Sequence, residues 1–143
     1  MRTFRTPDWL VISDTARSLL ELRYRLIPYL YSESRHTAAH GWPLMSALML
    51  DYPHDPTVRH IDDEYLLGRS RLCAPVLTED DTRQVYPPAG DWYDAWTGQR
   101  YRGPTWITYG CPIERMPLFA RAGTILPLGP VRQHVGEGDP STT

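Results

Sequence analysis

The sequence lacks lysine altogether, so all 15 of its basic residues are arginines, and these are scattered along the chain. With 17 acidic residues, the formal net charge at pH 7 is -2. A charge so close to zero, with no basic cluster, gives no reason to expect nucleic acid or an anionic membrane as a partner. The apolar fraction of 41% is that of an ordinary globular protein.

Long apolar runs are also missing. No run approaches the roughly 20 residues needed to cross a bilayer, and the first ten residues, MRTFRTPDWL, lack the apolar centre of a secretory signal. We therefore expect a cytoplasmic protein with no membrane partner. The two cysteines, Cys73 and Cys111, lie among apolar residues, and in a reducing compartment we interpret them as buried free thiols rather than as a disulfide.

Motifs that are typical of catalytic sites are absent from the sequence as well. There is no G-x-S-x-G nucleophile elbow, no phosphate-binding glycine loop and no C-x-x-C pair. His36 and His40 have a spacing that could hold zinc on a helix, but Thr37 stands where a zinc protease has Glu, and no third ligand is evident. We interpret them as two histidines near a helix C-terminus. The sequence thus predicts no metal, no cofactor and no catalytic residue.

One acidic cluster, Asp62-Asp63-Glu64, precedes an apolar segment. Adjacent carboxylates could serve as acid and base if burial separated their pKa values. Neighbours on an extended chain point to opposite faces, however, so a turn, a cap or a place at a sheet edge is the preferred interpretation.

The 143 residues predict a single domain in which the character of the chain changes near Gly41. Residues 13–40 have the apolar spacing of a helix, with Ser13 or Asp14 as its cap and Gly41 as its stop. Pro28 lacks an amide donor and should kink this helix. The apolar side chains that form the stripe are Leu19, Leu22, Leu26 and Leu30, with Leu20, Tyr24, Ile27 and Tyr31 beside them.

After Gly41, short apolar segments bounded by turn residues predict strands. They lie at 43–50, 64–68, 71–77, 83–88, 91–96, 105–109, 116–121 and 124–128. Thr97-Gly98 has the composition of a tight hairpin turn. The predicted fold is mainly β, a long N-terminal helix followed by an antiparallel β-sandwich. We expect a helical segment at 1–41, the sandwich at 42–129 and a disordered tail at 130–143.

Tryptophan is the remaining unusual feature, and DWYDAW holds two of the five. On a strand, Trp92 and Trp96 would share one face with Asp94 between them. Two aligned indoles beside a carboxylate could form a sugar platform, which makes Trp92, Asp94 and Trp96 the candidate substrate-binding residues. The alternative, which we prefer, is that the indoles form the core of a small sandwich.

Six motifs in one order carry a family resemblance. They are LRYRLIPYLY, GWPLMSALMLDYPHDP, IDDEYLLG, LCAPVL, VYPPAGDWYDAWTG and ERMPLFARAGTILPL. Together they resemble the C-terminal part of glycoside hydrolase family 31, which includes α-glucosidases and α-xylosidases, over about residues 15 to 128. The resemblance implies the last helix of a (β/α)8 barrel followed by the proximal β-sandwich. That helix would be apolar on most sides because barrel elements outside this sequence cover it.

Family members hydrolyse with retention by two aspartates, whose carboxyl groups lie about 5 to 5.5 Å apart. No stretch of this chain resembles either of them, so the resemblance transfers no catalytic residue. Ser46 stands where the family commonly has an arginine. If that arginine anchors the sandwich to the barrel, the anchor is lost here.

Three hypotheses follow. In the first, the chain is a C-terminal fragment of a family 31 α-glycosidase, inactive alone, and the complete enzyme hydrolyses α-linked glycosides. In the second, the sandwich is a free module that binds carbohydrate. In the third, the chain complements a separately encoded barrel. The expected partners are therefore the catalytic barrel, in cis or in trans, and an α-linked saccharide bound by the complete enzyme.

Overall fold

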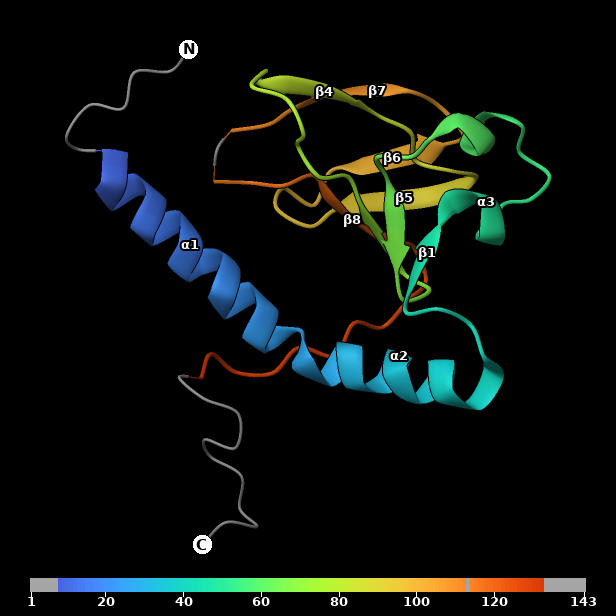
Figure 1. The fold of residues 1–143 in the computed structure, drawn as a ribbon, viewed down its shortest axis with the longest axis horizontal. Helices are drawn as coiled ribbons and strands as arrows, with labels where there is room; N and C mark the ends of the chain where they lie inside the picture. Colours follow the sequence, from blue (N-terminus) through green and yellow to red (C-terminus); the bar gives the residue numbers. More distant parts are fainter. Residues whose placement is uncertain (1–7, 113, 133–143) are drawn as a thin grey trace, which may run out of the picture. The chain divides into compact units, whose positions relative to one another are not determined.

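The computed structural model describes residues 8–112 and 114–132 of the chain (Figure 1). These residues divide into two compact units. One is Glu33–Ile125, and the other consists of the residues on either side of it. The tail predicted to be disordered falls mainly on residues 133–143, which lie outside the described part of the chain.

Two helices begin the described chain, α1 (Asp8–Arg25) and α2 (Ile27–His40). The sequence predicted one helix with a kink at Pro28, and the helix is interrupted at Leu26, two residues before this proline. Pro28 cannot donate a hydrogen bond to the preceding turn and its ring crowds that turn, which accounts for the interruption. The predicted start at Ser13 was wrong, because α1 begins at Asp8.

The end of α2 was predicted correctly. Gly41 has a φ of 72°, a left-handed conformation that glycine adopts without a steric penalty. Its N–H donates to the carbonyl of Thr37 at 2.8 Å, which closes the last turn. None of the helices in the described part of the chain is long and apolar enough to cross a membrane.

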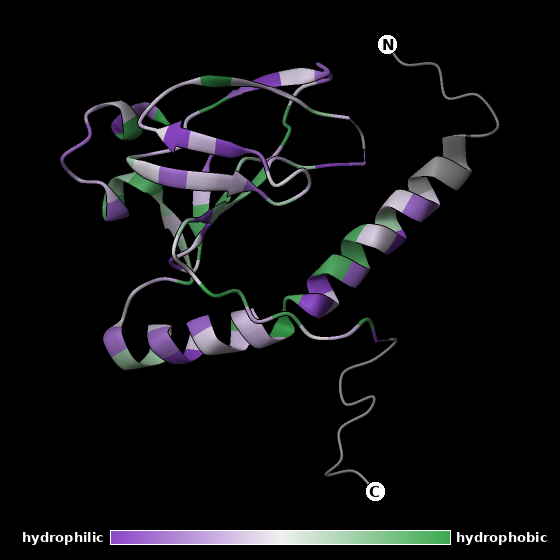
Figure 2. Cartoon of the chain, turned by 180° about the vertical axis from the view of Figure 1, so that it is seen from behind, coloured by the Kyte–Doolittle hydropathy of each residue, from purple (hydrophilic) through white to green (hydrophobic). Residues whose placement is uncertain are grey.

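The segment at 124–128 was predicted to be a strand, and this prediction was wrong, because the chain there is irregular. Pro127 cannot donate to a β-ladder. Beyond it, the N–H of Gly129 donates to the carbonyl of Arg25 at 2.7 Å, next to the helix interruption. Figure 2 shows hydrophobic residues recurring along α1 and at this interruption.

Within the described residues, eight strands form two antiparallel sheets, which confirms the predicted sandwich. The first sheet has the order β1-β2-β3-β8-β5-β6, and the second pairs β4 with β7. The strands are β1 (Met45–Ala47), β2 (Tyr65–Leu67), β3 (Arg71–Cys73), β4 (Thr82–Val85), β5 (Gly90–Asp94), β6 (Arg100–Gly103), β7 (Ile107–Gly110) and β8 (Leu118–Arg121).

Several predicted strands are shorter than expected, and two of them differ most. Residues 43–50 form only β1 before the chain turns into the short helix α3 (Leu48–Asp51), whose Leu48 is fully buried. Residues 71–77 form only β3, and the chain leaves the sheet before Pro75. The single-turn 3-10 helix η1 (Thr57–His60) follows α3. In these two segments the prediction of one continuous strand was wrong.

The hairpin between β5 and β6 was predicted correctly from Thr97-Gly98. Gly98 has a φ of 73°, and its N–H donates to the carbonyl of Asp94 at 2.9 Å. Asp94 in turn donates its N–H to the carbonyl of Gln99 at 2.9 Å. This turn sets the register in which Trp92 opposes Tyr101.

The core of the sandwich lies between the two sheets. Trp92 and Phe119 are both 0% exposed, and Tyr109 of β7 meets Phe119 of β8 edge-to-face with centroids 5.4 Å apart. Cys73 and Cys111 are buried free thiols, as predicted. On α2, the buried Glu33 accepts hydrogen bonds from the guanidinium of Arg69 at 3.1 Å, so the second half of this helix is tied to the loop after β2.

Candidate functional site

Trp92, the first residue of the predicted sugar platform, lies in the core. Its side chain is 0% exposed, and the indole N–H donates to the carbonyl of Pro88 at 2.9 Å. A ring covered on both faces by protein offers no surface for a sugar to stack on. The position of Trp92 therefore agrees with the core interpretation.

Asp94 is also buried, at 3% exposure. Its Oδ1 accepts hydrogen bonds from the backbone N–H groups of Trp96 and Thr97 at 2.7 and 3.2 Å. Its Oδ2 accepts the hydroxyl of Tyr109 at 2.7 Å. Burial, together with this bond, raises the pKa of Tyr109 well above its usual range, so the hydroxyl stays a donor. Asp94 thus caps the β5–β6 turn and joins the two sheets.

Trp96 does not share a strand face with Trp92. β5 ends at Asp94, so Trp96 lies in the turn that follows, half-buried, with its indole N–H donating to the carbonyl of Met116 at 2.8 Å. The alternation that would have aligned the two indoles applies only while the strand continues. The structure therefore does not bring the three candidates together as an open platform.

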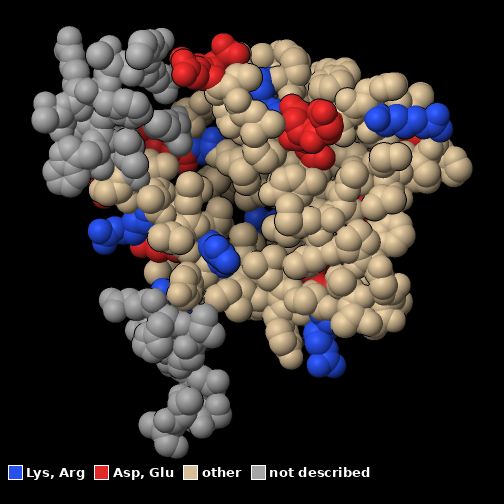
Figure 3. Space-filling view, viewed as in Figure 1, with Lys and Arg blue, Asp and Glu red and all other residues tan. Residues whose placement is uncertain are grey.

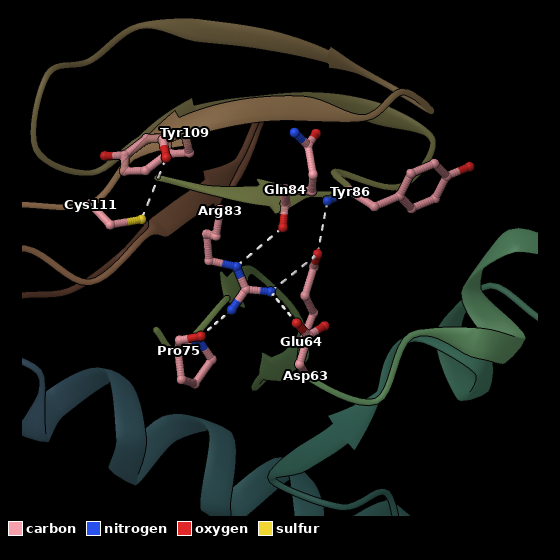
Figure 4. A network of polar contacts seen from close by, with 8 residues as sticks. All are labelled: Asp63, Glu64, Pro75, Arg83, Gln84, Tyr86, Tyr109 and Cys111. Carbon is pink, nitrogen blue, oxygen red and sulfur yellow. Dashed lines mark hydrogen bonds and ion pairs between the residues drawn. The ribbon is translucent and has the colours of Figure 1, made fainter. Parts of the chain in front are cut away.

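Two residues of the acidic cluster, Asp63 and Glu64, meet one arginine, as Figure 4 shows. Arg83 of β4 donates through Nη2 to Asp63 Oδ2 at 2.8 Å and lies 3.8 Å from Glu64 Oε1. A further Nη1 bond reaches the carbonyl of Pro75. Asp63 is exposed and Glu64 buried, which matches the expected opposite faces. Sequence reasoning missed Arg83, which lies about 20 residues further along the chain.

Glu64 is the most perturbed carboxyl group in this network. Burial raises its pKa to about 7, against the opposing effects of the Tyr86 N–H, which donates to Oε1 at 2.9 Å, and of Arg83. A pKa near neutrality suits a general acid. The Glu64 side chain is 0% exposed, however, so it cannot reach a substrate. Its contacts make it a link between the segment before β2 and the chain around β4.

The two histidines and the serine at the family's arginine position have structural contacts. The rings of His36 and His40 stack with centroids 4.1 Å apart. Among the described residues, no group of three or more potential ligands could hold a metal ion. Ser46 is buried and donates its hydroxyl to Asp51 Oδ2 at 2.7 Å, so it is satisfied inside the sandwich.

A groove that sequence reasoning did not find lies on the sandwich. Its volume is about 470 Å³. The residues that line it are Asp51, Tyr52, Pro53, His54, Asp55, Pro56, Ala89 and Pro104. One wall is formed by residues 51–56, at the end of α3 and in the loop that follows it, and the other wall comes from positions more than 30 residues away. No local pattern connects these two segments.

Charge on the face seen in Figure 3 is sparse. The arginine and acidic side chains stand singly or in small groups among uncharged residues, and no broad basic patch is visible on that face. This agrees with the small net charge and gives no support for a nucleic-acid surface there.

Comparison with known proteins first identifies the class of protein to which the chain belongs. Residues 41–126 match the Glycosyl hydrolase family 31 C-terminal domain. The sandwich is thus a C-terminal domain of glycoside hydrolases, and the chain belongs to glycosyl hydrolase family 31. The resemblance seen in the six motifs is confirmed.

Relatives and solved structures agree with this assignment. An isomaltosyltransferase of Sporosarcina globispora is 37% identical over 87% of this chain and 11% of its own length. A family 31 dextranase of Flavobacterium johnsoniae, solved with isomaltotriose, has a TM-score of 0.85 at 37% identity, covering 87% of this chain and 16% of that one. A family 31 α-xylosidase of Xanthomonas citri has a TM-score of 0.76 at 48% identity, covering 80% and 13%.

The difference in length matters for function. The chain spans between 10% and 17% of the length of the curated relatives it matches. What those relatives do therefore cannot be assigned to this segment without further argument.

Proposed function

We propose that this chain is the C-terminal domain of an α-glycosidase whose catalytic residues lie on a barrel outside the given sequence. The complete enzyme hydrolyses α-linked glycosides with retention, and the sandwich supports the barrel without contacting the scissile bond. The single observation that carries the proposal is the family match over residues 41–126, in a chain whose matched stretch makes up 17% or 10% of the length of such relatives.

The carboxyl groups of the sandwich support this division of labour. Retaining hydrolysis needs two carboxyl groups about 5 to 5.5 Å apart that can both reach the glycosidic bond. Asp94 and Glu64 are buried and occupied by structural hydrogen bonds. Asp63 is exposed but is held by Arg83. None of the three is available for that chemistry.

The helices supply the argument for a protein partner. Leu20 and Tyr31 are 55% and 64% exposed, and Leu19 and Ile27 are also exposed. Large apolar side chains gathered along one helical segment mark an interaction surface. We infer that the barrel covers them, whether it is part of the same polypeptide or a separate chain.

A chimera tests the proposal. In the Xanthomonas citri α-xylosidase, the segment matched by this chain is replaced by residues 8–132 of this protein. We expect a soluble enzyme that hydrolyses an α-xyloside with retention, observed by NMR of the first product anomer. The controls are the α-xylosidase truncated before the segment, which should be inactive, and this chain alone, which should give no hydrolysis.

Two results would contradict the proposal. One is hydrolysis of an α-glycoside by the purified chain alone. The other is a folded, soluble chimera without activity when the intact α-xylosidase is active under the same conditions.

A further inference from the structure

The groove between the loop 51–56 and Ala89-Pro104 combines apolar walls with a few polar groups. Prolines and an alanine supply much of the lining, while Asp51, His54 and Asp55 supply the charge or potential charge. Ligand sites are concave and mostly apolar, with a small number of fixed polar groups. This groove has that composition.

The carboxylates at the groove are held in place by the protein. Asp55 Oδ1 accepts the N–H of Thr57 at 2.9 Å, and its Oδ2 accepts the hydroxyl of Tyr86 at 2.8 Å. Asp51 Oδ2 accepts the hydroxyl of Ser46 at 2.7 Å. A carboxylate has about four acceptor positions, so each can accept further hydrogen bonds. Their anchoring means that a ligand would not have to order them.

Tyr52 lines the groove, but its hydroxyl is covered by protein. The hydroxyl oxygen is buried and has no hydrogen-bond partner in the structure. Like the carboxyl group of Glu64, a group covered in this way cannot reach a ligand. Tyr52 therefore adds to the wall of the groove and not to its hydrogen-bonding groups.

An exposed indole stands beside these groups. Trp106 is 50% exposed, and its ring centroid lies 5.1 Å from that of Tyr86, at an interplanar angle of 51°. Tyr86 is the residue whose hydroxyl bonds Asp55. Trp106 also follows the groove residue Pro104 by two positions. It therefore offers an apolar ring face next to a groove of carboxylates.

The chemistry of the groove selects its ligand. Two carboxylates and no arginine in the lining disfavour an anion. The described residues contain no group of ligands that could hold a metal ion. A neutral ligand with several hydroxyl donors and an apolar ring face fits the carboxylate acceptors and the exposed indole. We propose that this groove binds a saccharide, with its ring on Trp106 and its hydroxyls bonded to Asp51 and Asp55.

The proposal rests on the proposed function only for the choice of sugar. Because a family 31 relative was solved with isomaltotriose, isomaltotriose is the probe. It is titrated into the 143-residue chain labelled with ¹⁵N, in a background of Leu20→Glu and Tyr31→Glu that keeps the helices from self-associating. We expect saturable shifts of amide signals within residues 51–56 and 104–106.

Three variants separate binding from folding. Trp106→Ala should weaken binding about tenfold through loss of the stacking surface. Tyr52→Phe removes a hydroxyl that is buried and has no protein partner, so neither binding nor the unfolding midpoint should fall. Trp42→Ala removes an exposed indole that does not line the groove and should leave binding unchanged.

The proposal is overturned if the folded chain shows no saturable shifts. It is also overturned if Trp106→Ala binds as well as Trp42→Ala. The chimera reports on hydrolysis and this titration on binding, so each can fail without the other. An inactive chimera with an intact titration removes the proposed function and leaves the groove.

Discussion

The helices and the sandwich bury their large apolar side chains to very different extents. In the sandwich, Trp92, Phe119 and Leu72 are 0% exposed. On the helices, Leu20 is 55% exposed and Tyr31 is 64% exposed. The sandwich therefore carries its own core, whereas the helices present a surface that needs a partner. A chain of one family domain can thus contain one part that is complete and one that is not.

The largest loss of stability is expected from a substitution in the core of the sandwich. Trp92→Ala removes the largest fully buried side chain and should lower the free energy of unfolding by about 3 to 5 kcal/mol. The matched control is Trp42→Ala, because Trp42 is 39% exposed and its loss should cost less than about 1 kcal/mol. Denaturant unfolding followed by far-UV circular dichroism gives both values. Equal losses for the two variants would contradict the assignment of Trp92 to the core.

A smaller effect should depend on pH through Glu64. Its pKa is raised from 4.5 to about 7 on folding, so the folded protein holds this proton more tightly than the unfolded chain. Between about pH 4.5 and 7 the unfolded chain therefore binds fewer protons, and this group's contribution to stability falls as pH rises. The total change is on the order of 3 kcal/mol, fully present below pH 4.5 and absent above pH 7.

Glu64→Gln isolates this contribution, since Gln can still accept the Tyr86 N–H. Unfolding free energies of the parent and the variant are measured from pH 4.5 to 8, and their difference is compared at each pH. The variant should gain relative to the parent as pH rises. A difference that stays constant across this range would show that Glu64 does not titrate with a raised pKa.

The next effect concerns the bond between the two sheets. Tyr109→Phe removes the hydroxyl that donates to Asp94 Oδ2 at 2.7 Å and leaves a buried carboxylate oxygen without that donor. The expected loss is about 1 to 3 kcal/mol. Tyr93→Phe is the control, because Tyr93 on β5 is 40% exposed. If both variants unfold at the same denaturant concentration as the parent, the Tyr109–Asp94 bond does not stabilise the sandwich.

Much of the fold could be predicted because the signals are local. Turn residues separated most of the strand segments from one another, although several strands end earlier than predicted, and Thr97-Gly98 predicted the hairpin. Periodicity could not distinguish a strand from the helix α3, because Leu48, Met49 and Leu50 form an apolar run without alternation. The end of β5 was also invisible, since Trp96 would share a face with Trp92 only if the strand continued past Asp94.

The polar sites were harder to predict because their partners are distant in sequence. Glu64 meets Arg83, and Asp55 meets Tyr86 more than 30 positions away. Such pairs depend on how the two sheets close over the core. The family resemblance predicted more of the fold than periodicity did, because an ordered set of motifs identifies a whole domain and not only single elements.

The smallest effect on folding is expected on the helices, where the effect on association should be clear. Leu20→Glu and Tyr31→Glu together should change the free energy of unfolding by less than about 0.5 kcal/mol, because both side chains are exposed. The parent chain should self-associate and the double variant should be monomeric, as measured by sedimentation velocity at several concentrations. Arg23→Glu changes the charge of the same segment without removing an apolar side chain and serves as the control.

Leu20→Glu and Tyr31→Glu also test the difference between the helices, which need a partner, and the sandwich, which carries its own core. In the chimera, these charges would face the barrel, so they should reduce soluble, active enzyme while Arg23→Glu leaves it intact. A parent chain that is monomeric and unfolds reversibly in one sharp transition would mean that the helices need no partner. Activity of the doubly substituted chimera equal to that of the unsubstituted one would mean that the barrel contacts a different surface. In either case the exposed helical residues would lose their explanation as the interface, while the core of the sandwich would remain as described.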